Sequence, residues 1–126
     1  MRYLLDSTVL IDHANGDRPA AALLLRLFEE GHELYTCDVV SCEVLSGGTD
    51  SDLEHLRTLL AALDYVATPP DAAAWAGESR RKRHLAGEKR SLADSLIAGV
   101  AHALSATVVT RNRPDFERQG IRVLTY

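Results

Sequence analysis

The sequence has few cysteines, no clustered histidines and no excess of positive charge. Cys37 and Cys42 are the only cysteines among 126 residues, too few for a disulfide scaffold and without the paired spacing of a zinc site. We expect both to be small buried hydrophobic residues. The five histidines include no H-x-x-x-H pair, which disfavours zinc further. The formal net charge of −4 argues against a protein that binds polyanions over its whole surface.

Long apolar runs and aromatic clusters are also missing. No run approaches the roughly 18 apolar residues that cross a membrane, and no basic segment leads into an apolar one at the start, so we expect a soluble cytoplasmic protein. One Trp, four Tyr and two Phe are scattered along the chain, which disfavours recognition by base stacking. With 46% hydrophobic residues, the chain fits a single compact domain over 1–126.

Short apolar segments alternate with helical ones along the chain. Predicted strands cover 2–5, 33–36, 65–68, 107–110 and 121–124. Helix starts are indicated at Asp17, Ser51, Thr68 and Ser91, and the helix over 51–63 has an apolar stripe for the core. Because a parallel crossover needs roughly a dozen residues, usually a helix, we predict an α/β fold. It is a three-layer α/β/α sandwich with a mainly parallel central sheet.

Three acids stand where a parallel sheet places its chemistry, at or after the carboxyl ends of strands. Asp6 ends the first predicted strand, Glu43 lies about two turns into a helix that begins near Asp38, and Asp94 is the only charged residue in SLADSLIAGVAHAL. Each also has a structural interpretation. Asp is common after strands, Glu43 fits a rim acid or salt-bridge partner, and Asp94 fits a capping-box acid that returns a hydrogen bond to Ser91.

The segment TRNRPDF (110–116) follows a fourth predicted strand and adds Asn112 and Asp115 to the same edge, although Pro114 equally favours an ordinary turn. Converging carboxylates without histidine or cysteine form an oxygen-only site, which suits Mg²⁺ or Mn²⁺. Such a site can activate water and neutralise charge on a phosphate. Without a cation the clustered carboxylates would raise one another's pKa.

Taken together, the stretches LLDSTVLID, SCEVLSG, SLADSLIAGVAHAL and TRNRPDF, in this order over nearly the whole chain, resemble the PIN-domain ribonucleases. Within that family they are similar to the VapC toxins of bacterial toxin–antitoxin pairs. The resemblance implies an endoribonuclease that uses Mg²⁺ or Mn²⁺, cleaves a structured RNA such as a transfer or ribosomal RNA, and halts translation. It also implies a cognate antitoxin and a homodimer as partners.

The resemblance assigns roles to the acids by position. It implies that Asp6 and Asp94 are the central metal ligands, that Glu43 is a ligand or orients the attacking water, and that Asp115 supplies the fourth carboxylate. Asn112 occupies a competing position for that last role. Supporting hydrogen bonds are expected from Ser7, Thr110 and Asn112.

The basic stretch RRKRHLAGEKR (80–90) has two interpretations. It is either a solvated face at a helix end, which complements the helix dipole, or a surface that contacts RNA phosphates. The candidate RNA contacts are Arg80, Arg81, Lys82, Arg83, Lys89, Arg90, Arg111 and Arg113. Similarly, the apolar segment 20–31, with Leu24 and Phe28, is either buried within the domain or partly exposed for a partner.

Two other classes of protein place an acid after the first strand. Aspartyl-phosphate phosphatases need a second Asp two residues later, where this chain has Thr8, and receiver domains need a central acceptor Asp and a late Lys, which the sequence does not offer. A catalytically inactive PIN-like module that binds RNA or a partner is the alternative function. The presence of Asp6, Glu43 and Asp94 disfavours it.

Overall fold

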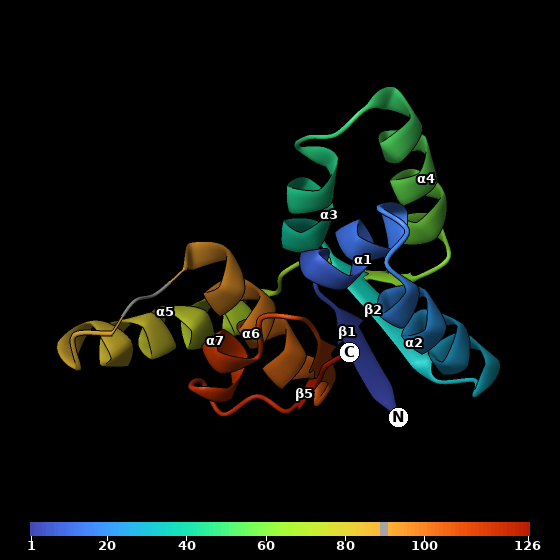
Figure 1. The fold of residues 1–126 in the computed structure, drawn as a ribbon. Helices are drawn as coiled ribbons and strands as arrows, with labels where there is room; N and C mark the ends of the chain where they lie inside the picture. The colour runs from blue at the N-terminus through green and yellow to red at the C-terminus, as the bar shows by residue number, and fades with distance from the viewer. Residues whose placement is uncertain (89–90) are drawn as a thin grey trace.

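Five parallel strands form the central sheet in the order β3-β2-β1-β4-β5 (Figure 1). The computed structural model describes residues 1–88 and 91–126, so the predicted RNA contacts Lys89 and Arg90 lie outside the described residues. The strands are β1 (Arg2–Leu5), β2 (Glu33–Cys37), β3 (Asp64–Val66), β4 (Thr107–Val109) and β5 (Val123–Leu124). The helices are α1 (Ser7–Ala14), α2 (Arg18–Glu29), α3 (Asp38–Leu45), α4 (Asp50–Ala61), α5 (Pro70–Leu85), α6 (Leu92–Leu104) and α7 (Arg113–Glu117).

The helices flank the sheet on both sides, which confirms the predicted α/β/α sandwich. In Figure 1, α1, α2 and α4 lie to one side of β1, and α5, α6 and α7 lie to the other. The chain runs outward from β1 to β2 and β3, then crosses back to β4 and β5. Because parallel crossovers are right-handed, this reversal moves the connecting helices to the opposite face. The point of reversal, between β1 and β4, is where such sheets open a crevice at their carboxyl ends.

Strands β1 and β4 and helix α6 contribute fully buried residues to the core. Leu5 pairs with Val109 in parallel register, and both are fully buried together with Ile97 and Val100 of α6. Burial on both faces explains why these strands read as continuous apolar runs. No helix among the described residues is long and apolar enough to span a bilayer.

Two of the predicted helix caps are confirmed. The carboxylate of Asp17 accepts a hydrogen bond from the Ala20 amide, and the Ser91 hydroxyl accepts one from the Asp94 amide. Side-chain acceptors of this kind satisfy amides that the first helical turn leaves without a partner. The helix that carries Asp94 therefore begins where the sequence predicts.

The other two caps are wrong. Helix α4 begins at Asp50, not after Ser51, because Thr49 and Asp52 form the capping box. Helix α5 has Pro69 as its N-cap, and the hydroxyl of Thr68 donates instead to Asp38 over 2.6 Å. The predicted strands at 65–68 and 121–124 shorten to β3 and β5, and the predicted helix over 51–63 ends at Ala61.

The burial of one cysteine was predicted wrongly, and the structure decides between the two interpretations of segment 20–31. Cys37 is buried but Cys42 is exposed. In α2, Leu24 is only 1% exposed and belongs to the core, so it cannot face a partner, whereas Phe28 is 40% exposed. The amphipathic stripe of α2 is thus wide enough to bury three leucines and leave Phe28 at its edge.

Candidate active site

Asp6 occupies the end of β1 and the N-cap position of α1, in the crevice between β1 and β4. Its side chain is 1% exposed. The hydroxyls of Thr110 and Thr8 donate to its Oδ2 over 2.7 and 3.3 Å, and the Ser7 hydroxyl lies 3.5 Å from Oδ1. Burial raises the pKa of Asp6, and the hydrogen bonds, first that from Thr110, oppose the rise. Neutral hydroxyl donors therefore stabilise the buried carboxylate of Asp6.

Glu43 and Asp94 approach Asp6 from two different helices. Glu43 lies in the last turn of α3, and the residue as a whole is exposed. Partial burial of its carboxyl raises the pKa of Glu43, as does the charge of Asp6, and a hydrogen bond from Ser7 opposes both. Asp94, in the first turn of α6, has its pKa raised to about 7 by burial first and then by Asp6 and Asp115, with Glu43 contributing. The acids lie close enough to disfavour one another's charged forms.

The TRNRPDF segment brings both of its polar candidates to Asp94. The side-chain amide of Asn112 donates to Oδ2 of Asp94 over 3.2 Å and to Oδ2 of Asp115 over 2.8 Å. The predicted turn is in fact the short helix α7, with Pro114 in its first turn. The expected capping box at Ser91 forms only in half, because the carboxylate of Asp94 accepts from Asn112 across the crevice. The charges of Asp6, Asp115 and Glu43 all act on Asp94, so the four acids lie at the same edge of the sheet, and their role as metal ligands stays a prediction.

Sequence reasoning missed Thr8. Its hydroxyl lies within hydrogen-bonding distance of Asp6 and of the Thr110 hydroxyl, and it accepts from the Arg111 amide over 3.0 Å. Thr8 thus joins α1 to the segment after β4. Its position two residues after Asp6 is the signal in the sequence that could have identified it.

Arg111 is also held by contacts that sequence reasoning missed. Its guanidinium pairs with Asp12 over 3.0 Å, and the phenol of Tyr126 donates to the same carboxylate over 2.5 Å. Burial, followed by hydrogen bonding to Asp12, raises the pKa of the Tyr126 phenol, so the tyrosine keeps its proton and acts as a donor. The last residue of the chain therefore helps to position a cation beside the site.

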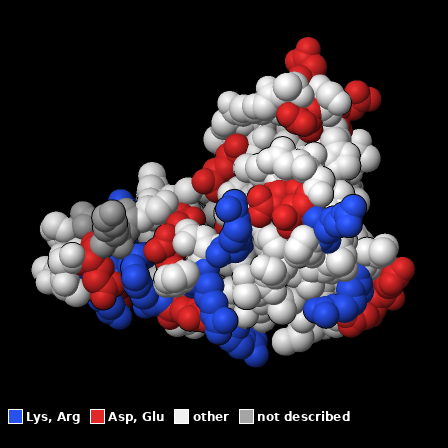
Figure 2. Space-filling model, viewed as in Figure 1, with Lys and Arg blue, Asp and Glu red and all other residues white. Residues whose placement is uncertain are grey.

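The predicted basic contacts do not form one uniform face. Arg81 and Lys82 are exposed, Arg80 is half-buried, and the side chain of Arg83 is buried at the end of α5. Arg113 forms an ion pair with Glu117 on its own helix. In Figure 2, acidic side chains gather near the centre of the displayed face, with Lys and Arg on both sides. On this face, basic side chains therefore flank the central group of acidic side chains.

The donor set of the site fits a hard divalent cation. All four acids offer oxygen only, and neutral hydroxyls and an amide support them, which suits Mg²⁺ or Mn²⁺ and not zinc. Within residues 1–88 and 91–126, no three His, Cys, Asp or Glu side chains already stand in an arrangement that encloses a metal ion. A divalent cation would offset the repulsion through which these carboxylates raise one another's pKa.

Comparison with known proteins places this chain in a family. The family model for the PIN domain matches residues 3–121. Ribonuclease VapC19 of Mycobacterium tuberculosis (strain ATCC 25618 / H37Rv) is 30% identical over 113 residues, which cover 90% of each chain. Ribonuclease VapC11 of the same strain is 32% identical over 120 residues, covering 90% of this chain and 88% of the relative.

Solved structures support the same fold. A chain of VapBC2 from Rickettsia felis, bound to a DNA fragment from the promoter, has a TM-score of 0.86 and 22% identity, and the match covers 100% of this chain and 99% of that one. DNA-bound VapBC from Salmonella typhimurium has a TM-score of 0.82 and 21% identity, with 99% and 98% covered. The similarity extends over the whole fold, including the edge of the sheet where the acids lie.

Proposed function

Because the chain belongs to the PIN domain family, we propose that it is a metal-dependent endoribonuclease toxin, acting through a single domain over 1–126. It cleaves a structured RNA, either transfer or ribosomal RNA, and so inhibits translation until a cognate antitoxin neutralises it. The observation that carries the proposal is the convergence of Asp6, Glu43, Asp94 and Asp115 at one edge of the sheet, where Asp94 reaches a pKa of about 7. The names of the VapC relatives support the choice of RNA as substrate.

Asp6 and Asp94 would hold the Mg²⁺ or Mn²⁺ ion, with Glu43 and Asp115 completing the oxygen ligands. A bound divalent ion supplies two kinds of chemistry here, a lower pKa for a coordinated water and neutralisation of charge on the phosphate. Both explain why carboxylates that disfavour one another's ionisation occupy one crevice.

The chain's own residues divide the remaining work. As the alternative to ligation, Glu43 would orient the attacking water and accept its proton, because its raised pKa makes the carboxylate a better base. Thr110, Thr8 and Ser7 fix the Asp6 carboxylate through their hydroxyls. Asn112 holds Asp94 and Asp115 together through one amide group.

In this proposal the protein is a cytoplasmic homodimer. Its macromolecular partners are the RNA substrate and the antitoxin. Arg111, the cations of α5 and Arg113 would contact RNA phosphates, giving affinity without sequence reading. One solved relative, VapBC-5 from Mycobacterium tuberculosis, is a member of the VapBC family of toxin–antitoxin systems, and VapBC2 from Rickettsia felis is bound to a DNA fragment from the promoter. These relatives support a protein partner of the same kind. Phe28 and Leu25 are the exposed apolar residues of α2 for such a contact.

The test is cleavage of total cellular RNA by purified protein with Mn²⁺ or Mg²⁺, with chelator, and by the variant Asp94→Asn, with the new ends mapped by sequencing. We expect discrete cuts that require both the metal and Asp94. Asp64→Asn, at the start of β3 and exposed, is the matched control and should cut like the unmodified protein. RNA binding without any metal-dependent cut would instead identify the inactive binding module.

A further inference from the structure

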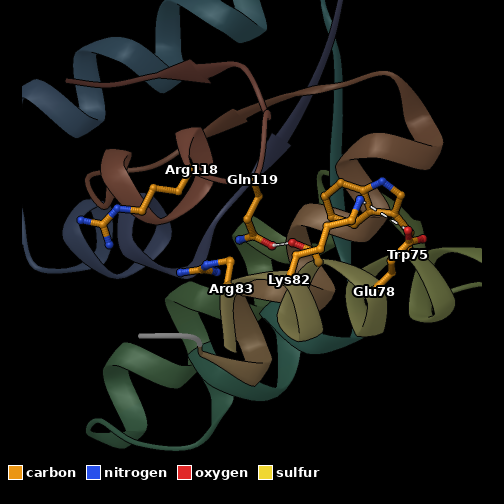
Figure 3. A pocket seen from close by; sticks show the side chains of 7 residues that line it. Trp75, Glu78, Lys82, Arg83, Arg118 and Gln119 are labelled. Carbon is orange, nitrogen blue, oxygen red and sulfur yellow. Dashed lines mark hydrogen bonds and ion pairs between the residues drawn. The ribbon is translucent and has the colours of Figure 1, made fainter. Parts of the chain in front are cut away.

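A small polar pocket lies between α5 and the end of α7, apart from the cluster of acids. Figure 3 shows it lined by Trp75, Ser79, Lys82 and Arg83 of α5 and by Arg118 and Gln119 after α7, with Glu78 at the edge. Its volume is about 170 Å³, below the roughly 300–1,000 Å³ of sites for drug-sized ligands. The pocket has room for one small group and a few waters.

The charge of the lining favours an anion. The lining holds three cations, Lys82, Arg83 and Arg118, and one acid, Glu78, which pairs with Lys82 over 3.4 Å between two exposed side chains. Exposed pairs of this kind are weak and open readily. Phosphate is the anion that best matches the two guanidinium groups, because each presents a planar fork of donors suited to two oxygens.

Arg83 gives the pocket a fixed cation. Its side chain is 6% exposed, with Glu88 3.7 Å from its Nε, and in Figure 3 its guanidinium points to the same side of the pocket as that of Arg118. A buried guanidinium is expensive to desolvate and loses little further freedom when an anion arrives. Arg83 therefore resembles a preorganised binding group more than a solvated surface charge.

Neutral contacts hold the two walls of the pocket in place. The Ser79 hydroxyl donates to Oε1 of Gln119 over 2.9 Å, and Nε2 of Gln119 donates to the backbone carbonyl of Asp115 over 2.8 Å. These bonds tie α5 to α7 and use the polar groups of Gln119 internally. Recognition of an anion thus falls to the three cations.

The pocket also connects directly to the proposed catalytic acids. Arg118 lies 3.8 Å from Asp115, and Asp115 shares the Asn112 amide with Asp94. An anion in the pocket would therefore lie on the α7 side of the acid cluster. Cations at this position can hold a polyanion that the acids alone would repel.

We propose that this pocket binds one backbone phosphate of the RNA substrate, next to the phosphate that is cut. The inference rests on the proposed function and names the part of the chain that anchors RNA beside the acids. The site reads no sequence, since it contacts phosphate only. It contributes affinity that weakens as salt rises.

The experiment measures binding of a transfer RNA pool to the Asp94→Asn protein in chelator, over a series of salt concentrations. Lys82→Gln and Arg118→Gln, introduced separately, should each raise Kd about 10-fold and lower the slope of log K against log salt by about 1. Glu78→Gln should tighten binding. Arg57→Gln removes an exposed cation from α4 and should leave both quantities unchanged, and thermal melts confirm folding.

Trp75, the only tryptophan, lines the pocket and stacks on His102 at 4.9 Å, so its fluorescence reports occupancy. We expect a change on adding RNA that Arg118→Gln reduces. If inorganic phosphate gives the same change at the same concentration and neither variant alters RNA binding, the pocket is a free-phosphate site and the inference is wrong. If the salt slope is unchanged in both variants while the unmodified protein cuts RNA at discrete sites, the phosphate-binding role of the pocket is wrong and the proposed function stands. If the unmodified protein neither binds nor cuts RNA, the role of the pocket and the proposed function are both wrong.

Discussion

The hydroxyl of Thr110 donates a hydrogen bond of 2.7 Å to Oδ2 of Asp6, across 104 positions of sequence. The bond joins the residue after β4 to the residue after β1, and both side chains are almost completely buried. A buried carboxylate without donors is costly. Thr110 is therefore the contact that allows an ionised acid at the switch point of the sheet.

Replacing Thr110 by valine should lower both stability and activity. The change keeps the shape of the side chain but leaves Asp6 without its shortest hydrogen bond, at a cost of about 1–3 kcal/mol in the free energy of unfolding at neutral pH. RNA cleavage should fall roughly 10–100-fold, as when an outer-shell partner of a metal ligand is lost. Urea denaturation and initial cleavage rates measure the two effects.

Thr36→Val is the matched control for that substitution. Thr36 is 1% exposed on β2, and its hydroxyl has no hydrogen-bond partner within the described part of the chain. Removing such a hydroxyl should leave the protein equally stable or more stable. If Thr110→Val and Thr36→Val lower the free energy of unfolding equally, the loss comes from placing valine at a buried position. The hydrogen bond to Asp6 is then not the cause.

Substitutions at Asn112 and Asp115 should show which of the two residues is the metal ligand and which supports it through its side-chain amide. Asp115→Asn removes a negative charge from the oxygen site and should weaken Mn²⁺ binding at least roughly 10-fold, whereas Asn112→Ala removes only a hydrogen-bond donor and should weaken it less. Titration calorimetry of the RNA-free protein measures both. The opposite order would make Asn112 the direct ligand.

The acids of the site were predictable because their placement follows from local rules. Residues at or just after the ends of parallel strands meet at one edge whatever the details of packing, so Asp6 and Asp115 could be grouped before the sheet order was known. Asp94 opens α6 and does not follow a strand, but it stood out as the only charged residue of an apolar helix. Glu43 needed only the start of its helix near Asp38. The strand order itself follows from the crossovers, which the alternating pattern indicates.

The predictions that failed concern positions where the sequence fits two local structures equally well. Thr49 with Asp52 and Ser51 with Glu54 both match a capping box, and tertiary packing selects the first. Arg83 lies in a run of four basic residues, and only the contact of Gln119, after α7, with α5 decides that it lines a pocket. Contacts such as Thr8 with Thr110 join distant segments and have no local signature.

The stability of the metal-free protein should depend on pH through Asp94. Its pKa is raised from 3.8 to about 7 in the folded state, so between these values the folded protein holds a proton that the unfolded chain has lost. The contribution of this group is fully present below the unfolded pKa and is lost as pH rises through about 7. The chelated protein should therefore become less stable between about pH 5 and pH 8.

Asp94→Asn removes that dependence and provides the measurement. In chelator at pH 8 the variant should unfold with a free energy about 1–2 kcal/mol above that of the unmodified protein, after allowance for solvent screening at a half-buried side chain. At pH 5 the difference should shrink. Asp64→Asn serves as the exposed control, and an equal gain for Asp94→Asn at both pH values would contradict the assignment.

The close approach of α5 and α6 should tolerate no side chain at Gly99. A Cβ there would lie 2.4 Å from the backbone carbonyl oxygen of Ala72, and backbone cannot give way as a flexible side chain can. Gly99→Ala should cost about 1–3 kcal/mol of stability. It should also lower cleavage, because α6 carries Asp94 in its first turn.

Gly77, within α5, is the matched control for Gly99 because a Cβ there meets nothing within 4 Å. Gly77→Ala should stabilise the protein by about 0.5–1 kcal/mol, since alanine favours the helix interior. Opposite shifts of the melting temperature for these two substitutions would show that α5 and α6 are held by backbone contact. That contact keeps the α5 pocket at a fixed position relative to the acids, so Gly99→Ala should also reduce the effect of Arg118→Gln on RNA binding, while Gly77→Ala should leave it unchanged.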